Sequence, residues 1–281
     1  MDKSNPLKYA IKRGVQSVAA KFGKHTQLPN EPQLLVLMYH RVLPKDDERT
    51  RFEEPGMFVS PATFRNNLAL LNKHFEFVKL VDWLEQKSSG LPLPKKSCAI
   101  TFDDGWADNY EYAFPVLQEM KIPATIFLVS DMMGTHQMFW PERLARTITE
   151  IAINKPNFWS SSSVSWLKYG HTDYKFNNVP PTQEELSQLI ANTKRFSDNE
   201  IHAFLNTIQQ ELALDESQYK PALMSWENVS EMIDSGLIDV GSHTCHHLRL
   251  NAQIANPVIE KEIIESKRKI EEKTGVSVKT F

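Results

Sequence analysis

The stretch that decides the fold is Cys98-Ala99-Ile100-Thr101-Phe102-Asp103-Asp104-Gly105, an apolar run that ends in two carboxylates and a glycine. The run predicts a buried strand over 98–102, and Asp-Asp-Gly is typical of the turn after a strand. A second apolar run, 237–240, precedes His243-Thr244-Cys245-His246-His247. A carboxylate and two histidines are a common hydrolytic metal set, because they leave coordination positions free for water and substrate. The pairing indicates a metal-dependent hydrolase.

Strands and helices alternate on both sides of this stretch. We expect strands at 34–39, 75–80, 98–102, 124–129, 237–240 and 276–281. We expect helices from Ser60-Pro61 and over 81–86, 109–120 (with a kink or restart at Pro115), 225–235 and 256–273. This alternation predicts an α/β fold with a parallel sheet, open or closed into a barrel. In such folds the chemistry gathers at the carboxyl ends of the strands. Four polar residues follow predicted strand ends: His40, Asp103, Asp104 and His243.

Residues 135–222 interrupt this alternation. Capping boxes run from Thr182 to Glu185 and from Ser197 to Glu200, and both predict helix starts. The serine run 160–163 is predicted to be a loop. We therefore expect a mostly helical insertion at about 135–222. Because it leaves from the end of the strand at 124–129, we expect it to border the substrate groove.

The composition is that of an ordinary soluble globular protein. The chain has 281 residues, a net charge of −3, 41% hydrophobic and 24% charged residues. The net charge gives no support for nucleic-acid binding, and two cysteines argue against a disulfide framework. The sequence shows no signal-peptide pattern. It also shows no apolar run of the roughly 20 residues that a membrane span needs. We expect a cytoplasmic location.

Residues 1–30 form a basic segment with helical spacing. Apolar residues at positions 7, 11, 15, 18 and 22 are surrounded by lysines and an arginine. A basic amphipathic helix can lie peripherally on an anionic membrane surface. A helix packed on the following domain would have the same pattern, so both interpretations stay open.

The motifs resemble those of polysaccharide deacetylases of the NodB-homology type, carbohydrate esterase family 4. The family's first motif, TFDDG, is matched at 101–105, and its second, H-[S/T]-x-x-H, by His243, Thr244 and His247. The segments Met38-Tyr39-His40-Arg41-Val42 and Ser225-Trp226-Glu227-Asn228 also resemble members. The resemblance covers about residue 33 to the end, apart from the insertion. It implies a distorted (β/α) barrel over 31–281, incomplete at its carboxyl end.

The resemblance also implies a site and a reaction. Asp104, His243 and His247 would hold a divalent metal ion, with zinc expected, and Asp103 would be the general base. Thr244 would brace the loop. The reaction would remove N-acetyl groups from amino sugars, so the expected partner is an acetylated polysaccharide or oligosaccharide.

Several further residues are weaker candidates. His40 is a candidate substrate contact, with a core or loop position as the alternative. Trp140 and Trp166 could stack on sugar rings, with core packing or an insertion hinge as the alternative. Cys245 is a candidate extra metal ligand, because it lies between the two motif histidines. His246 is a candidate proton donor, with a surface position as the alternative.

Other functions remain to be weighed against deacetylation. A zinc protease would need H-E-x-x-H, and Thr244 stands where the glutamate would be. An O-acetyl esterase or a deformylase acting on a carbohydrate would use the same residues as an N-deacetylase.

The sequence ends at Lys279-Thr280-Phe281, before the family's later motifs, which include the histidine that supplies the general acid. A truncated, non-catalytic glycan-binding homologue is therefore a further interpretation, with lower solubility and activity expected than for a longer form.

Overall fold

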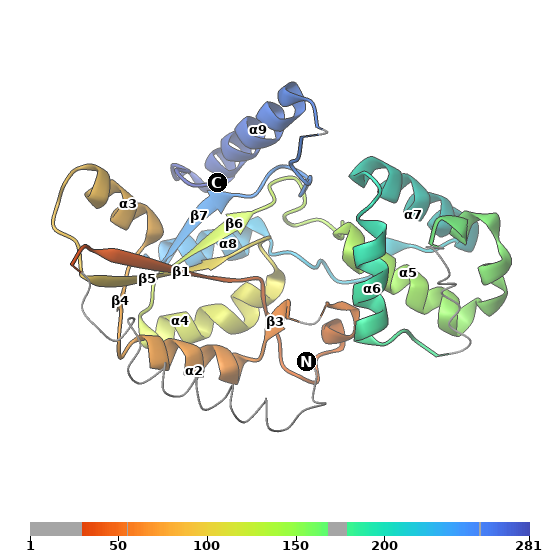
Figure 1. Ribbon diagram of the computed structural model, residues 1–281, viewed down its shortest axis with the longest axis horizontal. Helices are drawn as coiled ribbons and strands as arrows, with labels where there is room; N and C mark the ends of the chain where they lie inside the picture. Colours follow the sequence, from red (N-terminus) through yellow and green to blue (C-terminus); the bar gives the residue numbers. More distant parts are fainter. Residues whose placement is uncertain (1–29, 55, 168–178, 253) are drawn as a thin grey trace.

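The computed structural model describes residues 30–54, 56–167, 179–252 and 254–281, and a parallel sheet lies at its centre (Figure 1). The strands of this sheet are β1 (Gln33–Tyr39), β4 (Glu76–Phe77), β5 (Lys96–Phe102), β6 (Ala124–Leu128) and β7 (Ile238–Ser242). Their order is β1-β5-β6-β7, and every pairing is parallel. The short strand β4 pairs with the first half of β5, and β6 pairs with its second half. The predicted parallel α/β fold is confirmed.

The sheet is open, so the closed form of the expected barrel is not seen. Within the described part of the chain, no strand pairs with the outer edge of β1 or of β7. Residues 276–281 were expected to form a strand, and this expectation is wrong. They run beside β7 as irregular chain, where the Thr280 carbonyl accepts a hydrogen bond from the Ser242 N–H at 3.0 Å.

The strand β1 is less buried than its apolar sequence suggests. Leu35, Val36 and Met38 are 37%, 46% and 54% exposed. The expectation of a buried strand at 34–39 is therefore wrong for these residues, because β1 pairs on one edge only. By contrast, β5 is buried from Ser97 to Phe102, since it pairs with three strands.

The helices of the main body begin and end largely where the sequence signals place them. They are α2 (Pro61–Leu71), α3 (Leu80–Ser88), α4 (Phe114–Met120), α8 (Trp226–Asp234) and α9 (Asn256–Thr274). The Ser60 side chain caps α2 by accepting the Thr63 N–H, and Ser225 caps α8 in the same way. Before Pro115 a π-helical turn, Asn109–Ala113, precedes α4, so the expected restart at the proline is present.

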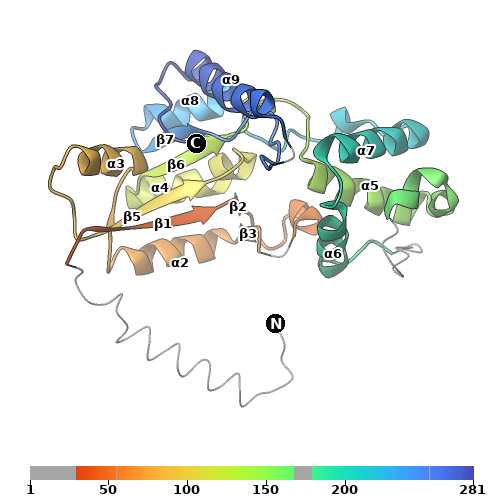
Figure 2. The ribbon, with the colours of Figure 1, turned by 45° about the horizontal axis from the view of Figure 1, so that its top comes forward.

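Four of these helices, α2, α4, α8 and α9, are linked by contacts. The π-helical turn before α4 contacts both α2 and α8, and α8 in turn contacts α9. Figures 1 and 2 show these helices around the sheet. Smaller elements close the region next to the end of β1. They are β2 (Arg41–Val42), β3 (Phe58–Val59) and a 3-10 turn, Glu48–Phe52.

The insertion is largely helical, as the sequence predicts. It contains α5 (Trp140–Asn154), α6 (Gln183–Thr193), α7 (Asp198–Leu212) and 3-10 turns at Pro156–Ser160, Ser162–Leu167 and Glu216–Gln218. Both predicted capping boxes are present. The serine run expected to be a loop lies in two of the 3-10 turns. The helices enclose their own core, which includes Leu144, Ile148, Ile151, Ile201, Leu205 and Ile208. They form a separate group beyond the carboxyl ends of the strands (Figures 1 and 2).

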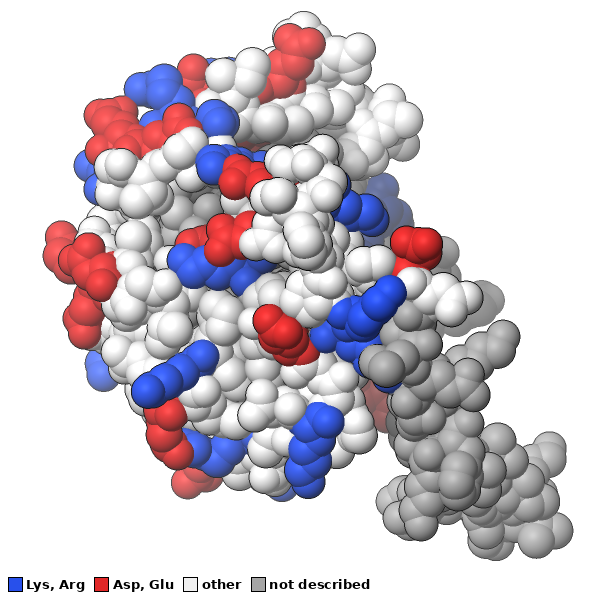
Figure 3. All heavy atoms as spheres, turned by 90° about the vertical axis from the view of Figure 1, so that its left-hand side faces the viewer, with Lys and Arg blue, Asp and Glu red and all other residues white. Residues whose placement is uncertain are grey.

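The basic segment predicted at 1–30 lies almost entirely outside the described residues. Among the residues that are described, no helix combines the length and apolarity required to cross a bilayer. On the face shown in Figure 3, basic and acidic side chains are interspersed with neutral ones. This pattern agrees with the small net charge of −3.

Candidate metal centre

The carboxylates of the first motif lie in a sharp turn at the end of β5. The Asp103 N–H donates a hydrogen bond to the Tyr39 carbonyl at 3.0 Å, which extends the pairing with β1 by one residue. Asp104 and Gly105 then take left-handed φ values of 78° and 82°. A Cβ at Gly105 would lie 2.9 Å from the Met133 sulfur, so glycine is required there. The turn separates the two carboxylates, and Asp104 becomes the buried one, at 3% exposure.

The histidines of the second motif lie in an irregular loop after β7. His243 and His247 are four residues apart and would share a face if the segment were one helical turn, but it is not a helix. Thr244 and His247 have left-handed φ values of 68° and 57°, which no helix contains. The loop is held against the end of β6, because its Thr244 carbonyl accepts the Ser130 N–H at 3.2 Å. The left-handed residues bring the two imidazoles together by a tight turn instead.

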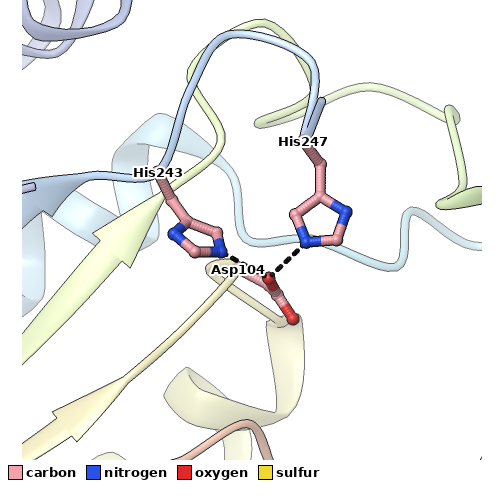
Figure 4. Close-up of side chains that lie close together, drawn as sticks. All are labelled: Asp104, His243 and His247. Atoms are coloured by element: carbon pink, nitrogen blue, oxygen red, sulfur yellow. Dashed lines mark ion pairs between the residues drawn. The ribbon is translucent and has the colours of Figure 1, made fainter. Parts of the chain in front are cut away.

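The three motif residues meet at one atom. Asp104 Oδ1 lies 3.4 Å from His243 Nε2 and 3.3 Å from His247 Nε2 (Figure 4). This oxygen is buried and has no hydrogen-bond partner among the residues that the structure describes. A buried charged oxygen without a donor is costly unless something else neutralises it. One oxygen and two imidazole nitrogens are a donor set that suits zinc or a similar divalent ion, so the residues fit a metal.

The charges around this cluster favour the metal-binding forms of Asp104 and His247, but not that of His243. Burial acts to raise the pKa of Asp104, but the contact with His243 and the nearby His247 together hold it below its usual value. Burial and the neighbouring His243 lower the pKa of His247, which keeps its imidazole neutral. For His243, burial acts against the charged form, but the Asp104 carboxylate raises the pKa. An ionised carboxylate and neutral imidazoles are the forms that coordinate metals.

Asp103 lies beside the cluster and not in it. Its Oδ2 is 3.9 Å from His40 Nε2, and both side chains are partly exposed. Burial raises the pKa of Asp103, although His243 and His40 act in the opposite direction. A carboxyl group with a raised pKa next to a metal site is suited to exchange protons with a reactant. His40 is thereby placed at the edge of the same site.

Trp106 is a contributor that the sequence reasoning missed. Its indole Nε1 donates a hydrogen bond to Asp104 Oδ2 at 2.8 Å, which leaves only Oδ1 facing the histidines. The Arg41 guanidinium lies over the indole at 4.0 Å, and Asp108 and Glu53 hold that arginine in the core. Trp106 follows Asp104 by two positions, but nothing in its spacing shows that the indole turns back.

Replacing Trp106 with phenylalanine should weaken metal binding. Phenylalanine keeps a ring under Arg41 but removes the donor that orients the carboxylate. Loss of an outer-shell partner typically costs roughly 10–100-fold in metal affinity. Competition with a chromophoric chelator measures this change. The matched control is Trp83→Phe, because the buried Trp83 indole N–H has no hydrogen-bond partner within residues 30–54, 56–167, 179–252 and 254–281. Equal zinc affinity in the wild-type protein and Trp106→Phe would contradict the assignment.

Cys245 and His246 belong to a second cluster, with Glu262. Cys245 is therefore not placed as a fourth ligand of the Asp104 cluster. Unlike Asp104, Glu262 has both oxygens engaged. Oε2 accepts the N–H groups of Cys245 and His246, and Oε1 pairs with His246 Nδ1. The carboxylate oxygens of the second cluster therefore both have protein partners, whereas Asp104 Oδ1 accepts no hydrogen bond from the described residues.

The tryptophans are not arranged as exposed stacking platforms. Trp140 is 5% exposed and packs in the core of the insertion, with the Arg249 guanidinium 5.7 Å from its ring. Trp166 packs on Phe204 with a centroid separation of 5.0 Å. Core packing describes Trp166, whereas Trp140 packs in the core and also lines the cavity beside His247.

The insertion contacts the loop that carries the histidines. The ring of Phe139, just before α5, lies 4.5 Å from that of His247. Asp198 at the start of α7 accepts hydrogen bonds from Arg249 at 2.6 and 2.9 Å. A cavity of about 250 Å³ lies between the two parts, and its lining includes Phe139, Trp140, Asn199, His202 and His247. The insertion therefore borders the site on the side of His247.

A parallel α/β sheet with an aspartate and two histidines at the carboxyl ends of its strands defines a protein with a candidate metal centre of hydrolytic type. The family model for polysaccharide deacetylases matches residues 90–160 and 181–281. The chain belongs to the polysaccharide deacetylase family.

Individual relatives match shorter parts of the chain. A poly-beta-1,6-N-acetyl-D-glucosamine N-deacetylase of Staphylococcus epidermidis is 34% identical over 109 residues, which are 36% of this chain and 37% of the relative. The Staphylococcus aureus protein of the same name is 34% identical over 113 residues, or 37% of this chain and 38% of that protein. The matched segment thus spans little more than a third of these curated relatives.

One solved structure illustrates the fold. The Streptococcus pyogenes deacetylase PplD in complex with acetate superposes with a TM-score of 0.50 at 17% identity, covering 88% of this chain and 72% of that one. At this identity the likeness concerns the fold alone.

Proposed function

We propose that this protein is a metal-dependent N-deacetylase that acts on the amino sugars of an acetylated glycan, with zinc as its metal. The observation that carries the proposal is the buried Asp104 Oδ1, which faces His243 and His247 and accepts no hydrogen bond from the described part of the chain. Asp103 lies next to this cluster as a separate carboxyl group. A ligand set with a free base beside it is the arrangement that amide hydrolysis needs.

The residues divide the work between binding and proton transfer. Asp104, His243 and His247 would hold the divalent ion, which when bound polarises a carbonyl and lowers the pKa of water. Asp103 accepts the proton of the water that attacks the acetamide carbon. His40, 3.9 Å from Asp103, orients that carboxylate. The carbon–nitrogen bond then breaks, which gives acetate and an amine that takes up a proton.

The substrate class is supported by the relatives. Those with 34% identity are named as deacetylases of poly-beta-1,6-N-acetyl-D-glucosamine. The cavity of about 250 Å³ between the insertion and His247 gives a bound glycan a surface next to the metal centre. The insertion would thereby take part in the choice of glycan.

The experiment that tests the proposal uses oligosaccharides of known acylation. Zinc-loaded protein is incubated separately with N-acetylated, O-acetylated and N-formylated glucosamine oligomers, and mass spectrometry follows the loss of each acyl group. Loss of acetyl groups from nitrogen, faster than the other two reactions, is expected. Removal of only the O-acetyl or only the formyl group would contradict the proposed reaction.

We also propose that residues 1–24 attach the protein peripherally to anionic membranes from the cytoplasmic side. The proposal is supported by the apolar spacing and flanking lysines of this segment. Co-sedimentation with vesicles that contain an anionic lipid should fall when residues 1–24 are deleted. Co-sedimentation of the full chain should also fall at high salt, because salt screens the attraction between the lysines and the lipid. Unchanged co-sedimentation of the shortened protein would contradict this proposal.

A further inference from the structure

Glu262 on α9 contacts the backbone of the loop that carries both metal-site histidines. Its Oε2 accepts the Cys245 N–H at 2.9 Å and the His246 N–H at 3.1 Å. Its Oε1 lies 2.8 Å from His246 Nδ1. The Glu262 side chain is 10% exposed. One buried carboxylate therefore binds two of the three residues that separate His243 from His247.

This loop needs an external support. Thr244 and His247 have left-handed φ values. A residue other than glycine in this conformation costs of order 1 kcal/mol or more in folding free energy. The carbonyls of Thr244 and Cys245 are satisfied by the N–H groups of Ser130 and Asp131. The N–H groups of Cys245 and His246 are satisfied by Glu262. Without this carboxylate, the strained loop would also carry two unpaired donors.

The His246 side chain ties this support to the end of β6. Its Nε2 lies 3.5 Å from Asp131 Oδ2, and Asp131 is in turn paired with Lys269 of α9 at 3.0 Å. His246 is thus a bridge between α9 and the segment after β6. The His246 side chain is 60% exposed, so it has the expected surface position while it makes these contacts.

We propose that Glu262 is a positioning residue of the metal centre, which fixes the spacing of His243 and His247 by accepting the N–H groups between them. The inference rests on the proposed function in one respect, namely that the Asp104 cluster binds a divalent ion. The acceptor oxygen carries the effect, and the negative charge of the carboxylate is secondary.

Zinc affinity tests this inference directly. The wild-type protein, Glu262→Gln and Glu262→Leu are titrated with zinc against a chromophoric chelator, and thermal melts are recorded without metal. Glu262→Leu should bind zinc roughly 10–100-fold more weakly. Glu262→Gln should stay close to the wild-type affinity, because the amide oxygen still accepts both N–H groups. If Glu262→Leu fails to fold, Glu262→Asp serves in its place, because its shorter side chain cannot reach both donors.

Glu271 provides the matched control. It lies on the same helix and its Oε1 also accepts a backbone N–H, that of Val278 at 2.9 Å, away from the metal loop. Glu271→Leu should leave zinc affinity unchanged even if it lowers the melting temperature. Equal weakening in Glu271→Leu and Glu262→Leu would overturn the proposal, because the effect would then reflect the loosening of α9.

The remaining outcomes separate this inference from the proposed function. A wild-type protein that binds no zinc would contradict the proposed function itself. Zinc binding by the wild type with equal affinity in Glu262→Leu would overturn only the role of Glu262. Equal weakening in Glu262→Gln and Glu262→Leu would also overturn it, since acceptance of the N–H groups would not be what matters.

Discussion

Asp103→Asn should lower the rate of acetate release by about 10²–10⁴-fold while it leaves the bound metal in place. The factor is that expected for the loss of one general base. Asparagine keeps the shape of the side chain but cannot take a proton from water. Metal is retained because Asp103 lies outside the cluster that Asp104 forms with the histidines. Steady-state rates and the metal content of the same sample measure both effects.

The paired variant Asp104→Asn is the control for this prediction. In the wild-type protein, both histidines converge on the Asp104 carboxylate. Asp104→Asn should therefore lose metal and activity together. If Asp103→Asn and Asp104→Asn lose equal amounts of metal, the assignment of base and ligand is wrong. If Asp103→Asn keeps full activity, another group must accept the proton.

His243→Ala and His247→Ala should each abolish stable zinc binding. Each change removes one of three protein ligands, so the loss should exceed the roughly 10–100-fold that an outer-shell partner contributes. Elemental analysis after dialysis against a weak chelator should find about one ion in the wild type and almost none in either variant. His74→Ala, which removes an exposed histidine in the turn after α2, should keep the ion. Retention of zinc in His243→Ala or His247→Ala would show that the ion binds elsewhere.

Local patterns in the sequence predict most of the sheet and its helices. Strand β5 is recognisable because its apolar residues are continuous, and the structure buries them between three neighbours. The starts of α2, α6, α7 and α8 follow from capping residues that act within one turn. These signals involve only residues close in sequence, so one sequence is enough to read them.

Features that depend on distant contacts could not be predicted. The exposure of Met38 on β1 and the irregular path of residues 276–281 depend on which strand edges are paired, which apolarity does not specify. The spacing of the motif histidines matches a helical turn, but their loop is bent by hydrogen bonds to the end of β6 and to α9. Glu262 joins this loop from 17 residues beyond Cys245. No motif marks that contact.

The candidate site was predictable in its members but not in its geometry. The motifs name Asp104, His243 and His247, and the structure brings these three together. The sequence does not show which carboxylate oxygen is free, because that depends on the hydrogen bond from Trp106 to the other oxygen. It also does not show that Trp140 packs in a core, since burial of an aromatic ring depends on the helices around it.

The most direct test of the account is a titration of metal-free protein with zinc, in which acetate release from an N-acetylated glucosamine oligomer is measured at each step. The account predicts no release without metal, a linear rise with added zinc, and a plateau at one ion per chain. Full activity in the chelator-treated protein would contradict it, as would the absence of release in a protein that has bound one ion per chain.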